Sequence, residues 1–300
     1  MKTGQPSTLI TGSTGFIGQR LVNALTSREE SLRLLKRRVE DGDHSSVTCD
    51  LMKLEIDDAW LHGIKTVYHL AGYAHDLSNP SEVAELYQRL NVEASIKLAE
   101  AAARAQVQSF VYVSSVKAAG SETNGQPDGI YGQTKREAEK KLLELGQKEG
   151  LRVVILRPSL VYGPDLKGNL ELMMRGIRDG WFPPLPETQN KRSMVHVDDV
   201  VNAMMYIADH PTSAGEIYTL TDGIDYSTRD IYDALRAVVG KNPTRLSVPY
   251  LAFELLGRLY PRFRHKLDKL FGTEFYSSDK IRALGFKTGR SLRDINETNY

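Results

Sequence analysis

The stretch that decides the fold is Gly12-Ser13-Thr14-Gly15-Phe16-Ile17-Gly18, a turn with glycine at every third position. The apolar run Ser7–Thr11 before it predicts a short buried strand, and Gly15–Ser27 after it predicts a helix. The first glycine permits a tight turn, the second lets another group approach the backbone, and the third lets the helix lie close to the sheet. The stretch therefore predicts the first strand–turn–helix unit of an α/β fold.

The same alternation continues through the first half of the chain. We expect further strands at Leu32–Leu35, Val47–Cys49, Thr66–Leu70, Phe110–Ser114, Leu151–Leu156 and Glu216–Thr221, helices at Ser81–Ala105 and Tyr131–Lys148, and a strand and helix within Val195–Ala208. Strands that alternate with helices predict right-handed crossovers and a parallel, doubly wound Rossmann sheet. Ligands of such a sheet bind at the carboxyl ends of its strands.

The pattern changes after Gly163, because the proline-rich run at 181–186 fits neither a regular helix nor a central strand. We expect a smaller, discontinuous substrate lobe formed by residues 163-192 and 222-300, with the Rossmann domain formed by 1-162 and 193-221. Leu251–Leu259 is apolar and predicts a helix. Glu254 and Arg258 interrupt it without building a basic face, so we expect it to face the core rather than a membrane.

Composition excludes several classes of protein. The 300 residues suit one α/β domain with a smaller lobe, and 39 Lys and Arg against 38 Asp and Glu leave no basic surplus for nucleic acid. No apolar run is long enough to span a membrane, and no cluster has metal-ligand spacing. The single cysteine, Cys49, cannot form an internal disulfide, and with no signal-like start it indicates the cytoplasm. We expect it to be a small buried residue rather than a nucleophile.

The strand–turn–helix context favours a dinucleotide site over an ordinary glycine turn, because a helix start offers free N–H groups and a positive dipole to phosphates. The second strand leads into Lys36-Arg37-Arg38, with no acidic residue before Glu40. An NAD site usually has an acid there, whereas a cation suits the 2′-phosphate of NADP. We predict NADP bound through Arg37, with NAD and a solvated basic turn as alternatives. Asp50 either accepts from the adenine amino group or caps the next turn.

Tyr131 and Lys135 are four residues apart on the predicted helix and share a face. A nearby ammonium favours the phenolate, so we expect Lys135 to lower the pKa of Tyr131 and make it an acid–base group. The alternative is that Tyr131 and Lys135 are two surface residues on an amphipathic helix with no catalytic role. Ser114 and Ser115 follow an apolar strand, which places them at the carboxyl edge of the sheet. A serine hydroxyl there can orient a substrate carbonyl. The alternative is that the two serines only form the turn that ends the strand. His196 is interpreted as a hydrogen-bonded structural residue.

Together these motifs resemble the extended short-chain dehydrogenases/reductases, and in particular their nucleotide-sugar branch. The resemblance covers nearly the whole chain and rests on the glycine turn, Leu70-Ala71-Gly72, Asn91, Ser114-Ser115, Tyr131-x-x-x-Lys135, Arg157-Pro158, Val161-Tyr162-Gly163-Pro164 and Arg192 to Asp199. It implies a Rossmann domain with a small nucleotide-sugar lobe, and often a homodimer formed through a four-helix bundle. The subfamily it resembles is the bacterial 4-keto-6-deoxy-sugar reductases and epimerase-like proteins of surface-polysaccharide pathways.

The resemblance also implies roles for individual residues. Ser115, Tyr131 and Lys135 would be catalytic, with Lys135 also bonding the nicotinamide ribose; Arg192 would hold the diphosphate and Asn169 would lie near the nucleotide. The implied cofactor contacts are Gly12, Thr14, Gly15, Phe16, Ile17, Gly18, Arg37, Asp50, Leu51, Leu70, Ala71, Gly72, Tyr131, Lys135 and Pro158. Val116 and Lys117 stand where the related dehydratases carry an Asp-Glu pair, so elimination of water lacks its acid and base.

The sequence therefore predicts NADPH-dependent reduction of the C4 ketone of a nucleotide-diphosphate 4-keto-6-deoxy sugar, with UDP as the expected nucleotide. The main alternative is an NAD-dependent UDP-hexose 4-epimerase with the same Ser-Tyr-Lys set. A reductase of a non-sugar ketone and a non-catalytic dinucleotide-binding protein are further alternatives. Arg192 argues against the first of these, and retention of both Tyr131 and Lys135 argues against the second.

Overall fold

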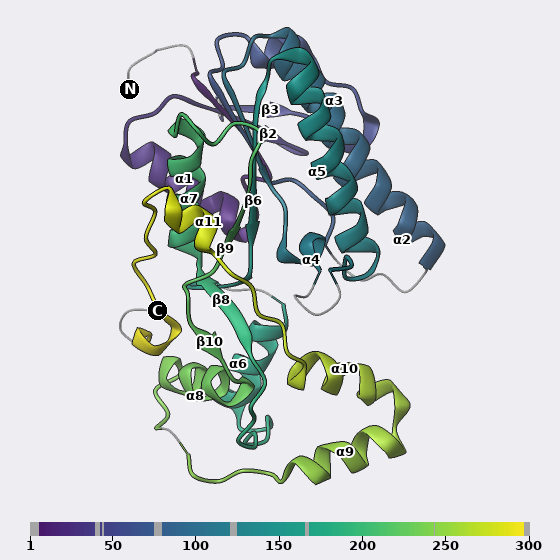
Figure 1. Ribbon diagram of the computed structural model, residues 1–300, viewed down its shortest axis with the longest axis vertical. Coiled ribbons are helices and arrows are strands. Elements are labelled where there is room, and N and C mark those ends of the chain that lie inside the picture. Colours follow the sequence, from purple (N-terminus) through teal and green to yellow (C-terminus); the bar gives the residue numbers. More distant parts are fainter. Residues whose placement is uncertain are drawn as a thin grey trace.

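The computed structural model of the chain describes residues 6–39, 43, 45–74, 80–120, 125–165, 168–242 and 244–296. Its main sheet, which lies in the upper part of the molecule in Figure 1, has seven parallel strands in the order β3-β2-β1-β4-β5-β6-β9. These strands are β1 (Thr8–Thr11), β2 (Leu32–Lys36), β3 (Ser46–Thr48), β4 (Thr66–His69), β5 (Ser109–Val113), β6 (Arg152–Pro158) and β9 (Ile217–Leu220). The predicted doubly wound Rossmann sheet is confirmed.

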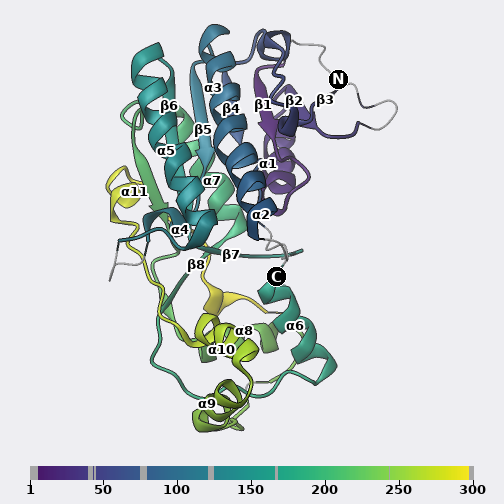
Figure 2. The ribbon, with the colours of Figure 1, turned by 90° about the vertical axis from the view of Figure 1, so that its right-hand side faces the viewer.

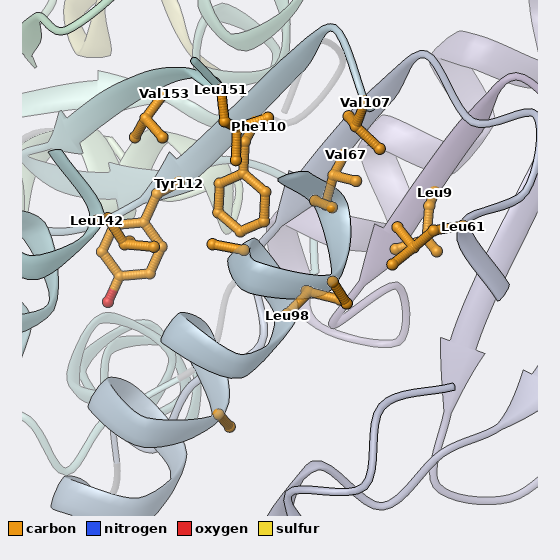
Figure 3. Packing of buried hydrophobic residues seen from close by; sticks show 14 of the residues in the cluster. Leu9, Leu61, Val67, Leu98, Val107, Phe110, Tyr112, Leu142, Leu151 and Val153 are labelled. Carbon is orange, nitrogen blue, oxygen red and sulfur yellow. The ribbon is translucent and has the colours of Figure 1, made fainter. Parts of the chain in front are cut away.

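Helices cover both faces of this sheet (Figure 2). The helices α1 (Phe16–Ser27) and α7 (Val197–Asp209) pack together on one face, and α3 (Ala94–Arg104) and α5 (Gly129–Glu149) pack together on the other. Strands covered on both sides need apolar residues on both sides, which is why every residue of β5 is buried. Figure 3 shows the core beneath α3 and α5, where Leu98 and Leu142 pack with Phe110.

The helix predicted over Ser81–Ala105 is three segments in succession. They are α2 (Pro80–Tyr87), the π-helical segment η3 (Gln88–Glu93) and α3. A π-helical turn inserts an extra residue into the helix and rotates the side chains that follow it, and such turns are frequent at functional sites. Here the π-helical segment contains Asn91, which is fully buried.

A smaller lobe lies below the carboxyl ends of the parallel strands (Figures 1 and 2). Its sheet consists of β7 (Leu160–Tyr162), β8 (Arg192–His196) and β10 (Asp225–Tyr226), of which β7 and β10 were not predicted. The remaining helices are α6 (Asn169–Asp179), which precedes β8, and then α8 (Thr228–Val238), α9 (Tyr250–Leu259), α10 (Pro261–Phe271) and α11 (Asp279–Ala283), which follow the last strand of the main sheet. Short helical turns are η1 (Leu51–Lys53), η2 (Asp58–Leu61), α4 (Val116–Ala119) and η4 (Leu292–Asp294). The division of the chain into two domains at the stated boundaries stays a prediction.

The prediction that Leu251–Leu259 faces the core was wrong. This segment is α9, and within it only Phe253 and Gly257 are buried. The reason is that α9 packs against α10, where the ring of Phe253 meets Phe271 at 5.3 Å between centroids. A single packed helix covers a narrow strip of its neighbour, so the remaining apolar side chains of α9 stay in contact with solvent. Within the described part of the chain, no helix is long and apolar enough to cross a membrane.

Candidate active site

The glycine turn lies where the strand order of the main sheet reverses, between β1 and β4. Gly12 has a φ of +71°, and a Cβ on it would stand 2.7 Å from the Ala71 nitrogen. A Cβ on Gly18 would stand 2.1 Å from the Gly12 carbonyl oxygen. Both positions therefore require glycine, and this reversal point is where open α/β sheets bind their ligands.

The start of α1 fits a dinucleotide phosphate. Gly15 is its N-cap and makes no side-chain capping bond, so the first N–H groups of the helix lack a cap. Thr14 and Gly15 are exposed, while Phe16 and Ile17 are half-buried behind them. Among the described residues, the buried Ser13 hydroxyl has no hydrogen-bond partner, which suits a phosphate oxygen.

The basic residues after β2 differ in their contacts. Lys36 donates to the Asp43 carboxylate at 2.8 Å, so its charge is already compensated. This bond, with bonds from Ser46 and Ser45, holds the pKa of Asp43 below its ordinary value. Arg37 is exposed, and within the described parts of the chain it makes no hydrogen bond or ion pair. Arg37 and the equally exposed Arg38 are thus the cations of this run available to a 2′-phosphate.

Asp50 performs the capping role that was left open, since its carboxylate accepts from the Met52 backbone at 3.1 Å. The neighbouring Leu51 is buried at the start of η1. At the end of β4, Leu70 is half-buried, and the Ala71 nitrogen donates to the Thr11 hydroxyl at 3.1 Å. These residues follow the carboxyl ends of β1, β3 and β4, where the cofactor contacts were predicted.

Gly72 connects this edge to the catalytic candidates. A Cβ on Gly72 would lie 3.0 Å from Asn91 Oδ1 and 3.2 Å from Lys135 Nζ, so only glycine leaves both side chains in place. Asn91 in turn accepts from the Tyr73 nitrogen at 2.7 Å and donates to the Thr134 hydroxyl at 3.3 Å. The π-helical segment thereby fixes the loop after β4 to the helix that carries Lys135.

Ser115, the N-cap of α4, and Tyr131 of α5 come together, and Lys135 stands one helical turn after Tyr131 on α5. Burial raises the pKa of Tyr131 to about 12, against the opposing effect of a hydrogen bond with Ser115. This is opposite to the direction expected from the sequence, because burial of the phenol outweighs the hydrogen bond with Ser115. Burial also lowers the pKa of Lys135 to about 8, while the charge of Glu139 acts to raise it. Lys135 Nζ donates to the Val113 carbonyl at 3.0 Å and lies 4.6 Å from the centroid of the Tyr112 ring.

Behind these residues is a buried polar chain that sequence reasoning missed. His69 Nδ1 is 2.6 Å from the Thr11 hydroxyl, and its Nε2 is 2.8 Å from the Ser95 hydroxyl. Ser95 donates to the Asn91 carbonyl at 2.8 Å. Burial, assisted by the charge of Lys135, lowers the pKa of His69 to about 3 and keeps the imidazole neutral. The sequence held one signal for this chain, because His69 is a polar residue at the end of an otherwise apolar strand.

The two substrate-side candidates of the smaller lobe stand on different elements, Asn169 on α6 and Arg192 on β8. Asn169 is exposed at the first position of α6. Pro158, which was predicted as a cofactor contact, is buried at the end of β6. Arg192, at the start of β8, donates to the Lys269 carbonyl, and its Nη1 lies 3.7 Å from the Glu274 carboxylate. Glu274 also accepts from Lys117 at 2.8 Å. Glu274, which the sequence did not suggest, therefore connects the helix after Ser115 to Arg192.

His196 has a structural role, as predicted. Its Nδ1 accepts from the Asp198 backbone at 3.1 Å and caps α7. Burial lowers its pKa, so the ring is held in the neutral form that can accept this bond. No group of histidine, cysteine or acidic residues able to hold a metal occurs in the regions that the structure describes.

Comparison with known proteins places this site in a family. Residues 8–220 match the model of the NAD dependent epimerase/dehydratase family. The chain belongs to this family. It is therefore an NAD(P)-dependent enzyme of the extended short-chain dehydrogenase/reductase type. A UDP-glucose 4-epimerase from Vibrio cholerae is 32% identical to it, over 96% of this chain and 92% of that protein.

Solved structures show the same fold as the enzyme. UDP-N-acetylglucosamine 4-epimerase from Bacillus cereus has a TM-score of 0.77 and 20% identity, covering 98% of this chain and 94% of its own. MoeE5 in complex with UDP-glucose and NAD has a TM-score of 0.73 and 24% identity, covering 96% of this chain and 95% of its own. At these identities the likeness concerns the fold, and it extends through both the Rossmann sheet and the smaller lobe.

Proposed function

We propose that the enzyme reduces the C4 ketone of a nucleotide-diphosphate 4-keto-6-deoxy sugar, with UDP as the nucleotide and NADPH as the reductant. The observation that carries this proposal is the exposed Arg37 after β2, a cation that suits the 2′-phosphate of an exchangeable NADPH. A phenol with a pKa of about 12 is protonated at neutral pH and begins the cycle as an acid, as reduction of a ketone requires. The relative from Vibrio cholerae supports a nucleotide sugar as the substrate.

In this mechanism the dinucleotide supplies the hydride when bound. The Ser115 hydroxyl orients the C4 oxygen, and Tyr131 donates its proton to that oxygen as the carbon is reduced. Lys135 stabilises the resulting phenolate by its positive charge and bonds the ribose of the cofactor. Gly72 leaves the space in which Lys135 can reach that ribose. Val116 and Lys117 offer no acid–base pair for removing water, and Lys117 is instead paired with Asp128 and Glu274.

The cofactor preference rests on Arg37. A reductase must exchange its oxidised cofactor after each turnover, and a 2′-phosphate bound by one exposed guanidinium suits such exchange. Arg192 is proposed to bind the diphosphate of the substrate. Arg192 now contacts the Lys269 carbonyl and the Glu274 carboxylate. A diphosphate would take the place of these two oxygen acceptors.

The second candidate is an NAD-dependent UDP-hexose 4-epimerase, which the 32% identical relative favours. An epimerase keeps its dinucleotide while the keto sugar rotates, so the cofactor should survive purification. The test is to denature the purified enzyme, assay the supernatant for dinucleotide, and incubate parallel samples with UDP-glucose and UDP-galactose. Consumption of NADPH with a UDP-4-keto-6-deoxy-hexosamine is the expected result. Co-purified NAD together with C4 inversion would establish the epimerase instead.

A further inference from the structure

The helix α9 presents a continuous apolar face to solvent. Leu251, Leu255 and Leu259 recur at every fourth residue, so they lie on one side of the helix. Their exposed fractions are 67%, 56% and 73%, and the adjacent Leu256 is 37% exposed. We call these four residues the leucine face. Apolar side chains concentrated in this way mark a surface that is covered by something other than water.

The surroundings of the leucine face are aromatic and basic. Tyr250 and Tyr260 stand at the two ends of α9, with exposed fractions of 49% and 57%. The segment from Tyr250 to Phe271 has five basic residues and two acidic ones, whereas the chain as a whole is balanced. The basic residues are Arg258, Arg262, Arg264, Lys266 and Lys269, and the acidic ones are Glu254 and Asp268. Positive charge is therefore concentrated in the segment of sequence that carries the exposed apolar face.

We propose that the leucine face, with the cations of α9 and α10, docks the enzyme on the surface of an anionic phospholipid bilayer. Amphipathic helices that lie in a membrane interface combine leucines on one side with Lys and Arg on the other, and tyrosine rings favour the headgroup level. The ten residues of α9 are too few to span a bilayer, which takes about 20. The helix therefore lies in the plane of the interface, with its leucines among the acyl chains and the cations at the phosphates.

The charges favour a bilayer over a second copy of this chain. A two-fold interface brings the same patch of both copies together, so each Arg258 and Arg264 would meet a like-charged partner patch. Both residues are exposed, and Arg258 is paired only weakly, at 3.2 Å, with Glu254 four residues earlier. An anionic headgroup layer compensates these charges at the same time as the acyl chains cover the leucines.

Docking through α9 also orients the substrate lobe. In both views α9 lies at the end of the molecule farthest from the Rossmann sheet (Figures 1 and 2). The following helix, α10, runs back from it and ends beside Arg192, whose guanidinium donates to the Lys269 carbonyl. Eleven residues of helix span roughly 16 Å. The bilayer would therefore lie on the side of the substrate lobe and leave the Rossmann domain in solution.

The test is flotation of the purified full-length enzyme with vesicles at low ionic strength. Vesicles of equal parts phosphatidylglycerol and phosphatidylcholine should carry the protein, and pure phosphatidylcholine should carry much less. Leu255→Gln combined with Leu259→Gln should lower the partition coefficient by about tenfold or more. Leu172→Gln is the matched control, because Leu172 is 46% exposed on α6, outside the leucine face. It should float like the native enzyme.

The cations are tested by Arg258→Gln combined with Arg264→Gln, which should weaken binding to anionic vesicles and reduce its sensitivity to salt. Circular dichroism and thermal unfolding confirm that each variant is folded. The proposal is overturned if the native enzyme does not float with anionic vesicles, or if the leucine variants float equally well. A native dimer that the leucine substitutions dissociate, with no flotation, would assign this face to a second copy. The outcome is independent of the proposed reaction, since flotation requires no turnover.

Discussion

Replacing Lys135 by methionine should make the protein more stable at neutral pH while removing most of its activity. Burial lowers the pKa of Lys135 from its ordinary 10.5 to about 8. At about 1.4 kcal/mol for each pH unit, holding the charged lysine in the fold costs about 3 kcal/mol below pH 8. Methionine has a similar length and no charge, but it loses the hydrogen bond to the Val113 carbonyl, worth about 1 kcal/mol. The expected net gain is about 2 kcal/mol.

The effect of Lys135 on the stability of the native enzyme depends on pH. Between about pH 8 and 10.5 the unfolded lysine binds a proton that the folded lysine has lost, so the stability of the native enzyme rises with pH across this window. Methionine does not titrate. The stability advantage of Lys135→Met should therefore be full below pH 8 and should become a deficit of about 1 kcal/mol by pH 10.5, where only the lost hydrogen bond remains.

Urea unfolding of both proteins at pH 7 and at steps up to pH 10 measures the difference, because titration of other groups is common to both. Lys141→Met is the control, since Lys141 lies on the same helix and is about half exposed. Its effect should stay within about 0.5 kcal/mol at every pH. A Lys135→Met protein that is less stable at pH 7, or a difference that does not change with pH, would refute the reasoning.

Three further changes test the site and its support. Tyr131→Phe should lower turnover by about 10²- to 10⁴-fold with little change in cofactor affinity measured by calorimetry, because only the transferable proton is removed; near-native turnover would exclude tyrosine from the mechanism. Arg37→Ala should remove about 1–3 kcal/mol of preference for NADPH over NADH, whereas equal affinities in the native enzyme would contradict the assignment. Glu139→Gln should destabilise the fold by about 3 kcal/mol in urea unfolding, since it breaks the buried bidentate pair with Arg157, and an unchanged midpoint would show that the pair is dispensable.

The candidate site was largely predictable because its signals are local. The spacing of Gly12, Gly15 and Gly18 encodes a tight turn and a close helix approach, and both are visible as Cβ positions that the backbone would block. Tyr131 and Lys135 share a helix face by spacing alone. Ser115 could be placed at the same edge, because parallel strands end together. Each of these inferences needed only the conformation of a short segment.

The electrostatic state of the site was not predictable in the same way. The sequence places an ammonium near Tyr131 and suggests a lowered pKa, but the pKa depends on how completely the fold removes water from the phenol. The chain of Thr11, His69 and Ser95 joins three elements whose residues are up to 84 positions apart, and the bridge from Glu274 to Lys117 spans 157. Such pairs form only when the whole sheet and lobe have assembled.

What the sequence by itself determined is the strand–helix alternation, the glycine turn and the Tyr-Lys pair, because backbone sterics and side-chain periodicity act within a few residues. What only the tertiary structure decided is which apolar faces find partners. The leucines of α9 have the pattern of a buried helix, yet α10 covers only the strip around Phe253 and Gly257, and the rest of the face meets solvent. Burial depends on the surface that the remainder of the chain can offer, and no local pattern contains that information.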